Sequence, residues 1–315
     1  MINRILLRIK VIQLLYAYYK GDIRNVEQAE EELFRSIEKA YELYFYLLLL
    51  VVDLTTYAKD RMERKKQIQE ANETDENLSS RFVENRFASQ LAINKDLLGY
   101  VKKHQLSWAQ HGEMIKELYQ EITASDYYAT YMNDKEDSYR KDKEFWRAVF
   151  KKVVAESEML GKELEEISIY WNDDAETVMS FIIKTIKQFE ESNGADQPLM
   201  PMFKDEEDRE FVRELFLNAI YNEAEYKQLI RDHSKNWELD RLAFMDSVII
   251  QAALAEIHTF PAIPVNVTMN EYIEIAKYYS THKSSVFVNG ILDSVIDKLR
   301  KDDKIIKIAY YTPNK

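Results

Sequence analysis

Residues that interrupt helices are scarce in this chain. Its 315 residues include only 6 glycines and 5 prolines. In a helix interior, glycine costs about 1 kcal/mol and proline about 3 kcal/mol relative to alanine. Apolar residues recur at helical spacing along most of the chain, and no stretch shows the alternation typical of a strand. The sequence therefore predicts an all-α protein with one large or two ordinary domains.

The first predicted helix covers residues 2–19, where the apolar stripe consists of Ile5, Ile9, Ile12, Tyr16 and Tyr19. A long helix is expected from about Val26 to Met62. The stretch "SNGADQPLMPMFKDEED" at 192–208 contains glycine, two prolines and an acidic run, and is the best candidate for a linker. Further helices are expected within 81–133, over 140–157, 160–170 and 175–191, and from Arg209 and Trp237 onward.

Two helix starts near the carboxyl terminus have local signals. Thr268 and Glu271 fit the T-x-x-E capping box, in which each side chain binds a free backbone N–H of the first turn. This pattern predicts that a helix begins there, after the Pro-bearing and extended connector "FPAIPVNV". The last helix is expected to take Ser284 or Ser285 as its cap.

Charge and cysteine content restrict the function. The net charge of −12 argues against a protein coated in nucleic acid, but both ends of the chain are locally basic. The absence of cysteine excludes disulfides, thiolate metal sites and a cysteine nucleophile. The apolar run "LYFYLLLLVV" at 43–52 is too short to span a bilayer, which needs about 20 residues. We expect a buried core helix there, and a cytoplasmic protein without membrane contact.

The motifs of catalysis are missing from the sequence. The five histidines lack metal-ligand spacing, and there is neither a phosphate-binding glycine loop nor a G-x-S-x-G elbow. We therefore expect a protein that is not an enzyme, with no cofactor, no metal and no small-molecule substrate. A binding pattern is present instead. Arg4, Arg8 and Lys10 lie within two helical turns, followed by Gln13 and three tyrosines, a mixture that suits phosphates and unpaired bases. A packed helix with a solvated face explains the same pattern.

Four patches together resemble one known family. "RILLRIKVIQLLY" at 4–16 resembles the amino-terminal R-R-x-A-R-E-x-A-x-Q-x-L-Y helix of NusB, the bacterial transcription antitermination factor. "NWELDRLAFMDSVIIQAALAEI", "IPVNVTMNEYIEIAK" and "FVNGILD" follow in the family's order. Matching positions include Trp237, Arg241, Asp246, Glu256, Pro264, Glu271, Ala276, Lys277 and 287–293. The resemblance implies a non-catalytic helical protein that binds boxA RNA together with the ribosomal protein NusE, joins RNA polymerase, and supports antitermination on ribosomal RNA operons.

The resemblance also implies roles for single residues. Arg4, Arg8 and Gln13 fall on the family's RNA-binding motif, which is thinned because Ile5, Leu6 and Ile9 replace other members. Lys10 and Lys283 are expected to compensate. The start of the last helix is expected to face RNA through Lys283, Ser284 and Phe287. Tyr16 and Asp246 match the family's contacts to NusE. Other readings stay open: Asp246 as a solvated or capping carboxylate, and Tyr16 and Phe287 as core residues.

The division of the chain follows from the same resemblance. We expect the family's first helix, with its basic arm, at 1–24, an extra helical region at 25–200, and the family's helical core with a basic tail at 201–315. The role of the extra region is not readable from sequence, and a structural or partner-binding role is expected. Two alternatives remain: a helical protein-interaction scaffold, and an RNA-binding module of a ribosomal RNA modification system.

Overall fold

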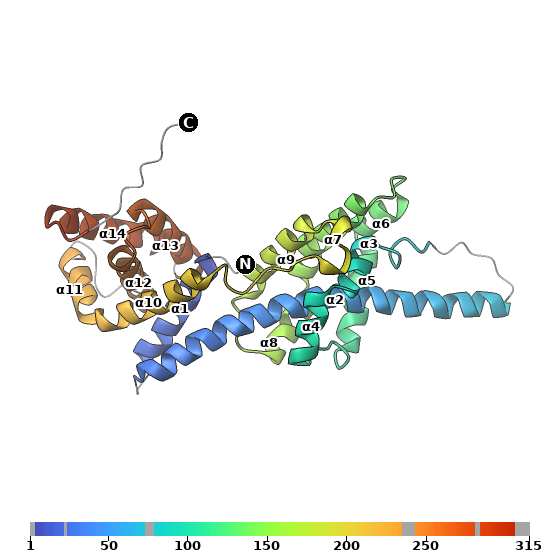
Figure 1. Ribbon diagram of the computed structural model, residues 1–315, viewed down its shortest axis with the longest axis horizontal. Coiled ribbons are helices and arrows are strands. Elements are labelled where there is room, and N and C mark those ends of the chain that lie inside the picture. Colours follow the sequence, from blue (N-terminus) through green and yellow to red (C-terminus); the bar gives the residue numbers. More distant parts are fainter. Residues whose placement is uncertain (1–3, 22–23, 73–78, 235–242, 281–283, 306–315) are drawn as a thin grey trace. The chain divides into compact units, whose positions relative to one another are not determined.

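The computed structural model describes residues 4–21, 24–72, 79–234, 243–280 and 284–305. Within these ranges the regular elements are helices and short 3-10 turns, with no strand (Figure 1). The predicted all-α class is confirmed. The chain divides into two compact units, one formed by 1–37 and 203–315, the other by 38–202. The first three turns of α2 (Val26–Asn72) therefore belong with the first unit, whereas the sequence reading placed them in the extra region.

The first unit gathers the amino-terminal helix and the five carboxyl-terminal helices. These are α1 (Arg4–Lys20), α10 (Glu206–Tyr221), α11 (Glu223–His233), α12 (Phe244–Thr259), α13 (Val265–Tyr279) and α14 (Ser284–Lys301). Helix α12 lies among the others: it packs on α1, α10, α11, α13 and α14. Its buried residues run without a break from Val248 to Ile257. A helix that is apolar all round is expected at the centre of a core.

Helix α1 is enclosed more completely than its sequence suggests. The residues from Leu6 to Ile12 are all buried, including the charged Arg8 and Lys10. Helix α1 packs on both α10 and α12. The sequence reading expected an amphipathic helix with a solvated basic face. That expectation is wrong for this stretch, because Glu256, on the distant helix α12, supplies a buried partner for Arg8.

The capping-box prediction is also wrong. Helix α13 begins at Val265 with Pro264 as its N-cap, so Thr268 lies inside the helix. The hydroxyl of Thr268 donates instead to Oε1 of Glu256 at 2.8 Å, twelve residues earlier in the chain. Part of the expected extended connector is therefore helical. The Thr268 hydroxyl therefore binds a buried carboxylate of a neighbouring helix and does not cap α13.

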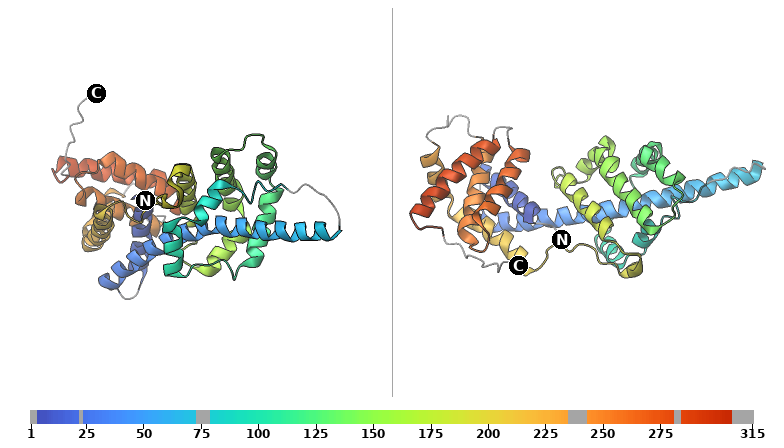
Figure 2. Two further views of the ribbon diagram at one scale, coloured as in Figure 1. Left: turned by 45° about the vertical axis from the view of Figure 1, so that its right-hand side comes forward. Right: turned by 90° about the horizontal axis from the view of Figure 1, so that it is seen from above.

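The second unit is built around the rest of α2 (Figure 2). Its other helices are α3 (Arg86–Ala92), α4 (Lys95–His104), α5 (Gly112–Ala124), α6 (Asp126–Asn133), α7 (Tyr139–Lys152), α8 (Glu158–Ile167) and α9 (Ala175–Gln188), with 3-10 turns η1 (Val154–Glu156) and η2 (Glu191–Asp196). Asparagine and serine side chains cap several starts: Asn85, Asn94, Ser125, Ser138 and Ser157 each accept a backbone N–H.

The apolar run of α2 lies in the core of this unit. Most residues between Leu43 and Leu54 are buried, and Trp108, Trp146 and Trp171 are among the largest enclosed side chains. Trp108 stacks on Tyr46 of α2 with ring centroids 3.9 Å apart. By length and composition, α2 is the one helix of the described chain that is long and apolar enough to cross a membrane. Of its most apolar 18-residue stretch, 56% is buried inside the protein.

The segment before α10 is tied to the second unit by side chains that bind its backbone. Gln90 Nε2 donates to the carbonyls of Glu190 and Gly194, and Asn94 Nδ2 donates to the carbonyl of Gln197 at 2.7 Å. Tyr41 donates to the carbonyl of Met200 at 2.8 Å. The predicted linker at 192–208 is therefore held along its first half, and α10 begins at Glu206 with Asp205 as its cap.

Asp53 gives the second unit a pH-dependent stability. Burial raises the pKa of Asp53 from 3.8 to about 6. The stability that this group contributes is therefore present below about pH 4 and is lost as the pH rises through 6. We expect Asp53→Asn to stabilise the protein by about 2–3 kcal/mol at pH 7 and by almost nothing at pH 4. Urea unfolding of both proteins across this range measures the difference, and a difference independent of pH would contradict the assignment.

Candidate functional site

Arg8 lies at the centre of a buried polar network in the first unit. Its Nε donates to Oε2 of Glu256 at 2.7 Å, and its Nη2 donates to Oε1 at 2.8 Å. The same carboxylate accepts the hydroxyl of Thr268 at 2.8 Å and that of Tyr272 at 3.1 Å. Glu271 lies 3.5 Å from Nη1 of Arg8. One carboxylate thus joins α1, α12 and α13.

The charges of this network are well compensated. Burial by itself lowers the pKa of Arg8, but the hydrogen bonds and the charge of Glu256 outweigh it, and the pKa is raised. Burial and the same carboxylate raise the pKa of Tyr272, which keeps its hydroxyl a donor. The side chain of Arg8 is 4% exposed and that of Glu256 0% exposed. In this arrangement Arg8 holds helices together and offers no surface to a phosphate; its predicted RNA contact stays a prediction.

Arg4 is the more accessible of the two predicted arginines. Its Nε donates to Asp208 Oδ1 at 2.8 Å, and its side chain is 39% exposed. Its Cζ lies 4.8 Å from the centre of the Phe211 ring, a cation–π contact. Further along α1, Lys10 is 2% exposed and Gln13 is half-buried. Arg4 therefore keeps part of its guanidinium at the surface.

A second group of predicted residues gathers at the other end of α1. The ring of Tyr16 meets Phe244 edge-on with centroids 5.2 Å apart, and Lys20 Nζ lies 4.5 Å above the same phenylalanine. Phe244 opens α12, two residues before Asp246. Tyr16 is half-buried, so its ring packs against the core and keeps a surface edge.

Asp246 is enclosed and is bound by two serine hydroxyls. Ser284 Oγ donates to its Oδ2 at 3.0 Å, and Ser280 Oγ donates to its Oδ1. Asp246 is 4% exposed and Ser284 is buried. These bonds tie the start of α12 to the end of α13 and the start of α14. Asp246 is therefore a buried carboxylate in the first turn of a helix, where the macrodipole favours negative charge.

The structure divides the predicted site residues between two places. Arg4 and Tyr16 are twelve residues apart on one helix, which corresponds to about 18 Å. At about 100° per residue, Gln13 also points to the opposite side of α1 from Arg4. Ser284 lies near the Tyr16 end of α1, because it binds Asp246, which follows the Tyr16 contact Phe244 by two residues. Phe287 is half-buried on α14. Lys283, like Trp237 and Arg241, lies outside the described residues.

Some residues of these networks had no assigned role in the sequence reading. Glu256, Asp208, Tyr272 and Ser280 fall in this group. Glu256 had a signal, because a carboxylate within the apolar run "AALAEI" requires a buried partner. For Ser280 no local signal exists, since its bond to Asp246 spans 34 residues.

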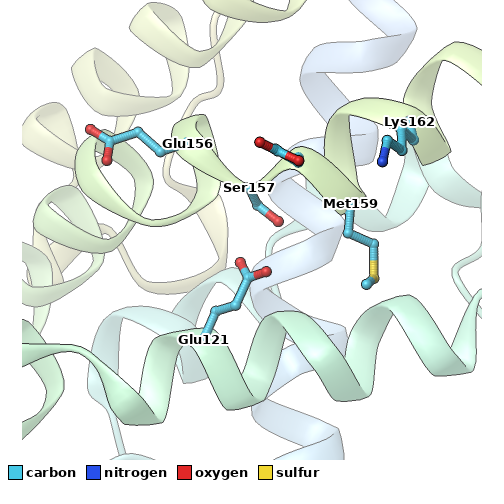
Figure 3. Close-up of a pocket in the computed structure, with 6 residues that line it drawn as sticks. Glu121, Glu156, Ser157, Met159 and Lys162 are labelled. Carbon is cyan, nitrogen blue, oxygen red and sulfur yellow. The ribbon is translucent and has the colours of Figure 1, made fainter.

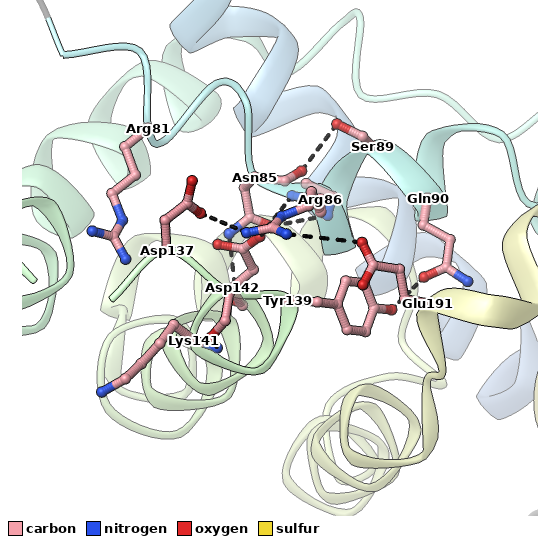
Figure 4. A network of polar contacts seen from close by, with 12 residues as sticks. Arg81, Asn85, Arg86, Ser89, Gln90, Asp137, Tyr139, Lys141, Asp142 and Glu191 are labelled. Carbon is pink, nitrogen blue, oxygen red and sulfur yellow. Dashed lines mark hydrogen bonds and ion pairs between the residues drawn. The ribbon is translucent and has the colours of Figure 1, made fainter. Parts of the chain in front are cut away.

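Polar clusters in the second unit have structural explanations. Arg86 binds Asp137 and Asp142, and Asp142 accepts the backbone N–H of Arg86 at 3.0 Å and the hydroxyl of Tyr131 at 2.7 Å (Figure 4). These bonds fix α3 against α7. An open hollow beside the start of α8 is lined by Glu121, Glu156 and Lys162 among others, and nothing in it assigns a reaction (Figure 3). Among the described residues, no group of three His, Asp or Glu side chains is placed to hold a metal ion.

Comparisons with known proteins match part of the chain to one family. A model of the NusB family matches residues 176–297, from α9 into α14. The chain is 33% identical to the transcription antitermination protein NusB of Salinibacter ruber over 132 residues, which cover 40% of this chain and 82% of the relative. The chain is 38% identical to the NusB protein of Bacillus mycoides over 94 residues, which cover 30% of this chain and 72% of that relative. It is 40% identical to the NusB protein of Chloroherpeton thalassium over 92 residues, which cover 29% of this chain and 44% of that relative. No solved structure matches the chain.

Proposed function

This chain belongs to the NusB family, and we propose that it is an RNA-binding transcription antitermination factor. In this proposal it binds boxA-type RNA together with NusE and acts in the cytoplasm on RNA polymerase that transcribes ribosomal RNA operons. Its role is binding rather than catalysis. The observation that carries the proposal is the similarity to a transcription antitermination protein over 82% of that relative's length.

Two features of the first unit support an RNA contact. Arg4 presents a partly exposed guanidinium at the start of α1, fixed by Asp208 and Phe211. The last turn of α14 and the residues after it carry exposed cations at Lys298, Arg300, Lys301 and Lys304. Cations of this kind neutralise RNA phosphates without regard to base sequence.

For the partner protein, the two predicted contacts differ in accessibility. Tyr16 keeps a surface edge beside Lys20 and Phe244, which suits a contact with another protein. Asp246 is enclosed by Ser280 and Ser284, so it acts on NusE through the position of α14 rather than through its own carboxylate. We therefore propose Tyr16 as the direct contact and Asp246 as its support.

The test of the RNA face uses Arg4→Gln with Arg213→Gln as control. Each arginine binds one carboxylate of the first unit: Arg4 binds the buried Asp208 at 2.8 Å, and Arg213 binds the half-buried Glu30 at 2.6 Å. We expect Arg4→Gln to weaken binding of boxA RNA about threefold or more and to lower the slope of log K against log salt by about 0.7. The control should leave both unchanged. Unaltered affinity and slope in Arg4→Gln would remove Arg4 from the RNA face.

A further inference from the structure

The second unit carries a cluster of cations on a chain that is acidic overall. Five basic residues fall between 59 and 66 near the end of α2, against the two carboxylates Asp60 and Glu63; we refer to Lys59, Arg61, Arg64, Lys65 and Lys66 as the basic end of α2. All five are exposed. In Figure 1 the last turns of α2 extend past the other helices of its unit.

The basic end of α2 has no ionic partner inside the described protein. Exposed cations elsewhere in the second unit bind carboxylates, for example Lys95 with Asp196 at 2.6 Å and Arg140 with Glu144 at 3.0 Å. Over the described ranges, no carboxylate lies within ion-pair distance of the five cations. A helical surface that is polar all round gains little from packing. Its charge is therefore available to an anionic partner.

Aromatic rings lie directly beside these cations. Arg61 and Lys65 line a hollow together with Phe82, Tyr119 and Tyr128. Arg61 Cζ lies 5.9 Å from the centre of the Tyr119 ring, and Phe82 meets Tyr119 and Tyr128 with centroids 5.9 and 5.7 Å apart. Both tyrosines are half-buried, so each keeps part of its ring at the surface. Cations above partly exposed rings are the combination that binds single-stranded nucleic acid.

The helix geometry separates Arg61 and Lys65 from the nearest acidic residues. At about 100° per residue, Arg61, Arg64 and Lys65 fall within a 100° arc. Asp60 and Glu63 lie at least about 100° away from Arg61 and Lys65. Acidic residues follow in the sequence at 70–76, but the side that carries Arg61 and Lys65 also carries the hollow. The electrostatic attraction for an anion is thus focused where the rings are.

We propose that the basic end of α2 and this hollow form a second RNA-binding surface, which takes single-stranded RNA. Arg61, Arg64 and Lys65 neutralise phosphates, while an unpaired base stacks on Tyr128. The choice of RNA as the anion rests on the proposed function, and the surface itself rests on the contacts above. The extra region then supplies cations that the first helix lacks, because Arg8 and Lys10 are buried there.

The test uses the full chain and an unstructured 20-nucleotide RNA without boxA, in the absence of NusE. We expect Arg61→Gln with Lys65→Gln to weaken binding about tenfold and to reduce the salt slope by about 1.4, since two phosphate contacts are lost. The matched control is Lys102→Gln with Lys103→Gln, which removes the same charge from an exposed turn of α4 and should change neither value.

The stacking contact has its own pair of variants. Tyr128→Leu should weaken binding about tenfold at an unchanged salt slope, because it keeps apolar packing but removes the flat ring. Tyr128→Phe should bind as the unmodified protein does. Circular dichroism confirms that each variant is folded.

Three results separate the outcomes. Unchanged affinity and slope in the double Arg61–Lys65 variant would overturn the proposal. Loss of binding to anionic lipid vesicles in that variant, with RNA affinity unchanged, would overturn it in favour of a membrane surface. If boxA and NusE fail to bind the unmodified chain while this surface still binds RNA, the proposed function falls and this inference stands.

Discussion

Replacing Arg8 by methionine is expected to lower the free energy of unfolding by about 3–5 kcal/mol. The change leaves the Glu256 carboxylate buried with only Thr268 and Tyr272 as donors. An uncompensated buried charge is far more costly than the loss of the attractive contact itself. Chemical denaturation measures the loss, and a variant within 1 kcal/mol of the unmodified protein would show that the pair does not hold the fold.

A double-mutant cycle separates the charge from the packing. Arg8→Met combined with Glu256→Met removes both charges and replaces them with apolar side chains of similar length. We expect the double variant to be more stable than Arg8→Met alone, since no charge stays buried without a partner. A double variant that loses the sum of the two single losses would contradict this account.

The stability result determines how RNA binding is tested. A lower RNA affinity in an Arg8 variant would reflect a damaged fold as readily as a lost contact. Arg4, whose side chain is 39% exposed, carries less of this ambiguity. Its partner Asp208 is buried, so each Arg4 variant is first checked by chemical denaturation before its RNA affinity is compared. Arg4 is therefore the residue on which the RNA face is decided.

Asp246→Lys is expected to destabilise the first unit by about 3–5 kcal/mol, rather than to weaken partner binding alone. The substitution places a cation in an enclosed position and removes the acceptor of Ser280 and Ser284. It also puts positive charge in the first turn of α12, which the helix macrodipole opposes. Thermal unfolding checks the loss.

The matched control for Asp246→Lys is Asp297→Lys, the same reversal at an exposed position of α14. This control should shift the unfolding free energy by about 0.5 kcal/mol or less. If Asp246→Lys is as stable as the control but fails to bind NusE, the carboxylate itself contacts the partner and the supporting role proposed here is wrong.

Much of the fold could be predicted because its signals are local. Helices dominate where Gly and Pro are missing, and the helix expected at 175–191 is observed as α9 at Ala175–Gln188. The linker signal at 192–208 falls where the chain leaves one unit for the other. The run at 43–52 predicts a core helix because its apolar residues cover the whole circumference of a helix and not one face. Most of this run is buried in the structure.

The site could not be predicted to the same extent, because its decisive contacts are remote in sequence. Arg8 and Glu256 are 248 residues apart, and only their pairing shows that Arg8 is buried. Thr268 fitted a capping box, yet Pro264 starts the helix and Glu256 takes the hydroxyl. The hollow beside Arg61 depends on Tyr119 and Tyr128 from two other helices. No local pattern encodes such contacts.

The most direct test of the account is the coupling between RNA and NusE on the unmodified chain. Titration of boxA RNA with and without NusE should show that NusE raises the RNA affinity about fivefold or more, and that the RNA raises the affinity for NusE by the same factor. A scrambled RNA of equal length should show no such gain. Equal affinities for boxA and scrambled RNA in the presence of NusE would contradict the proposed function.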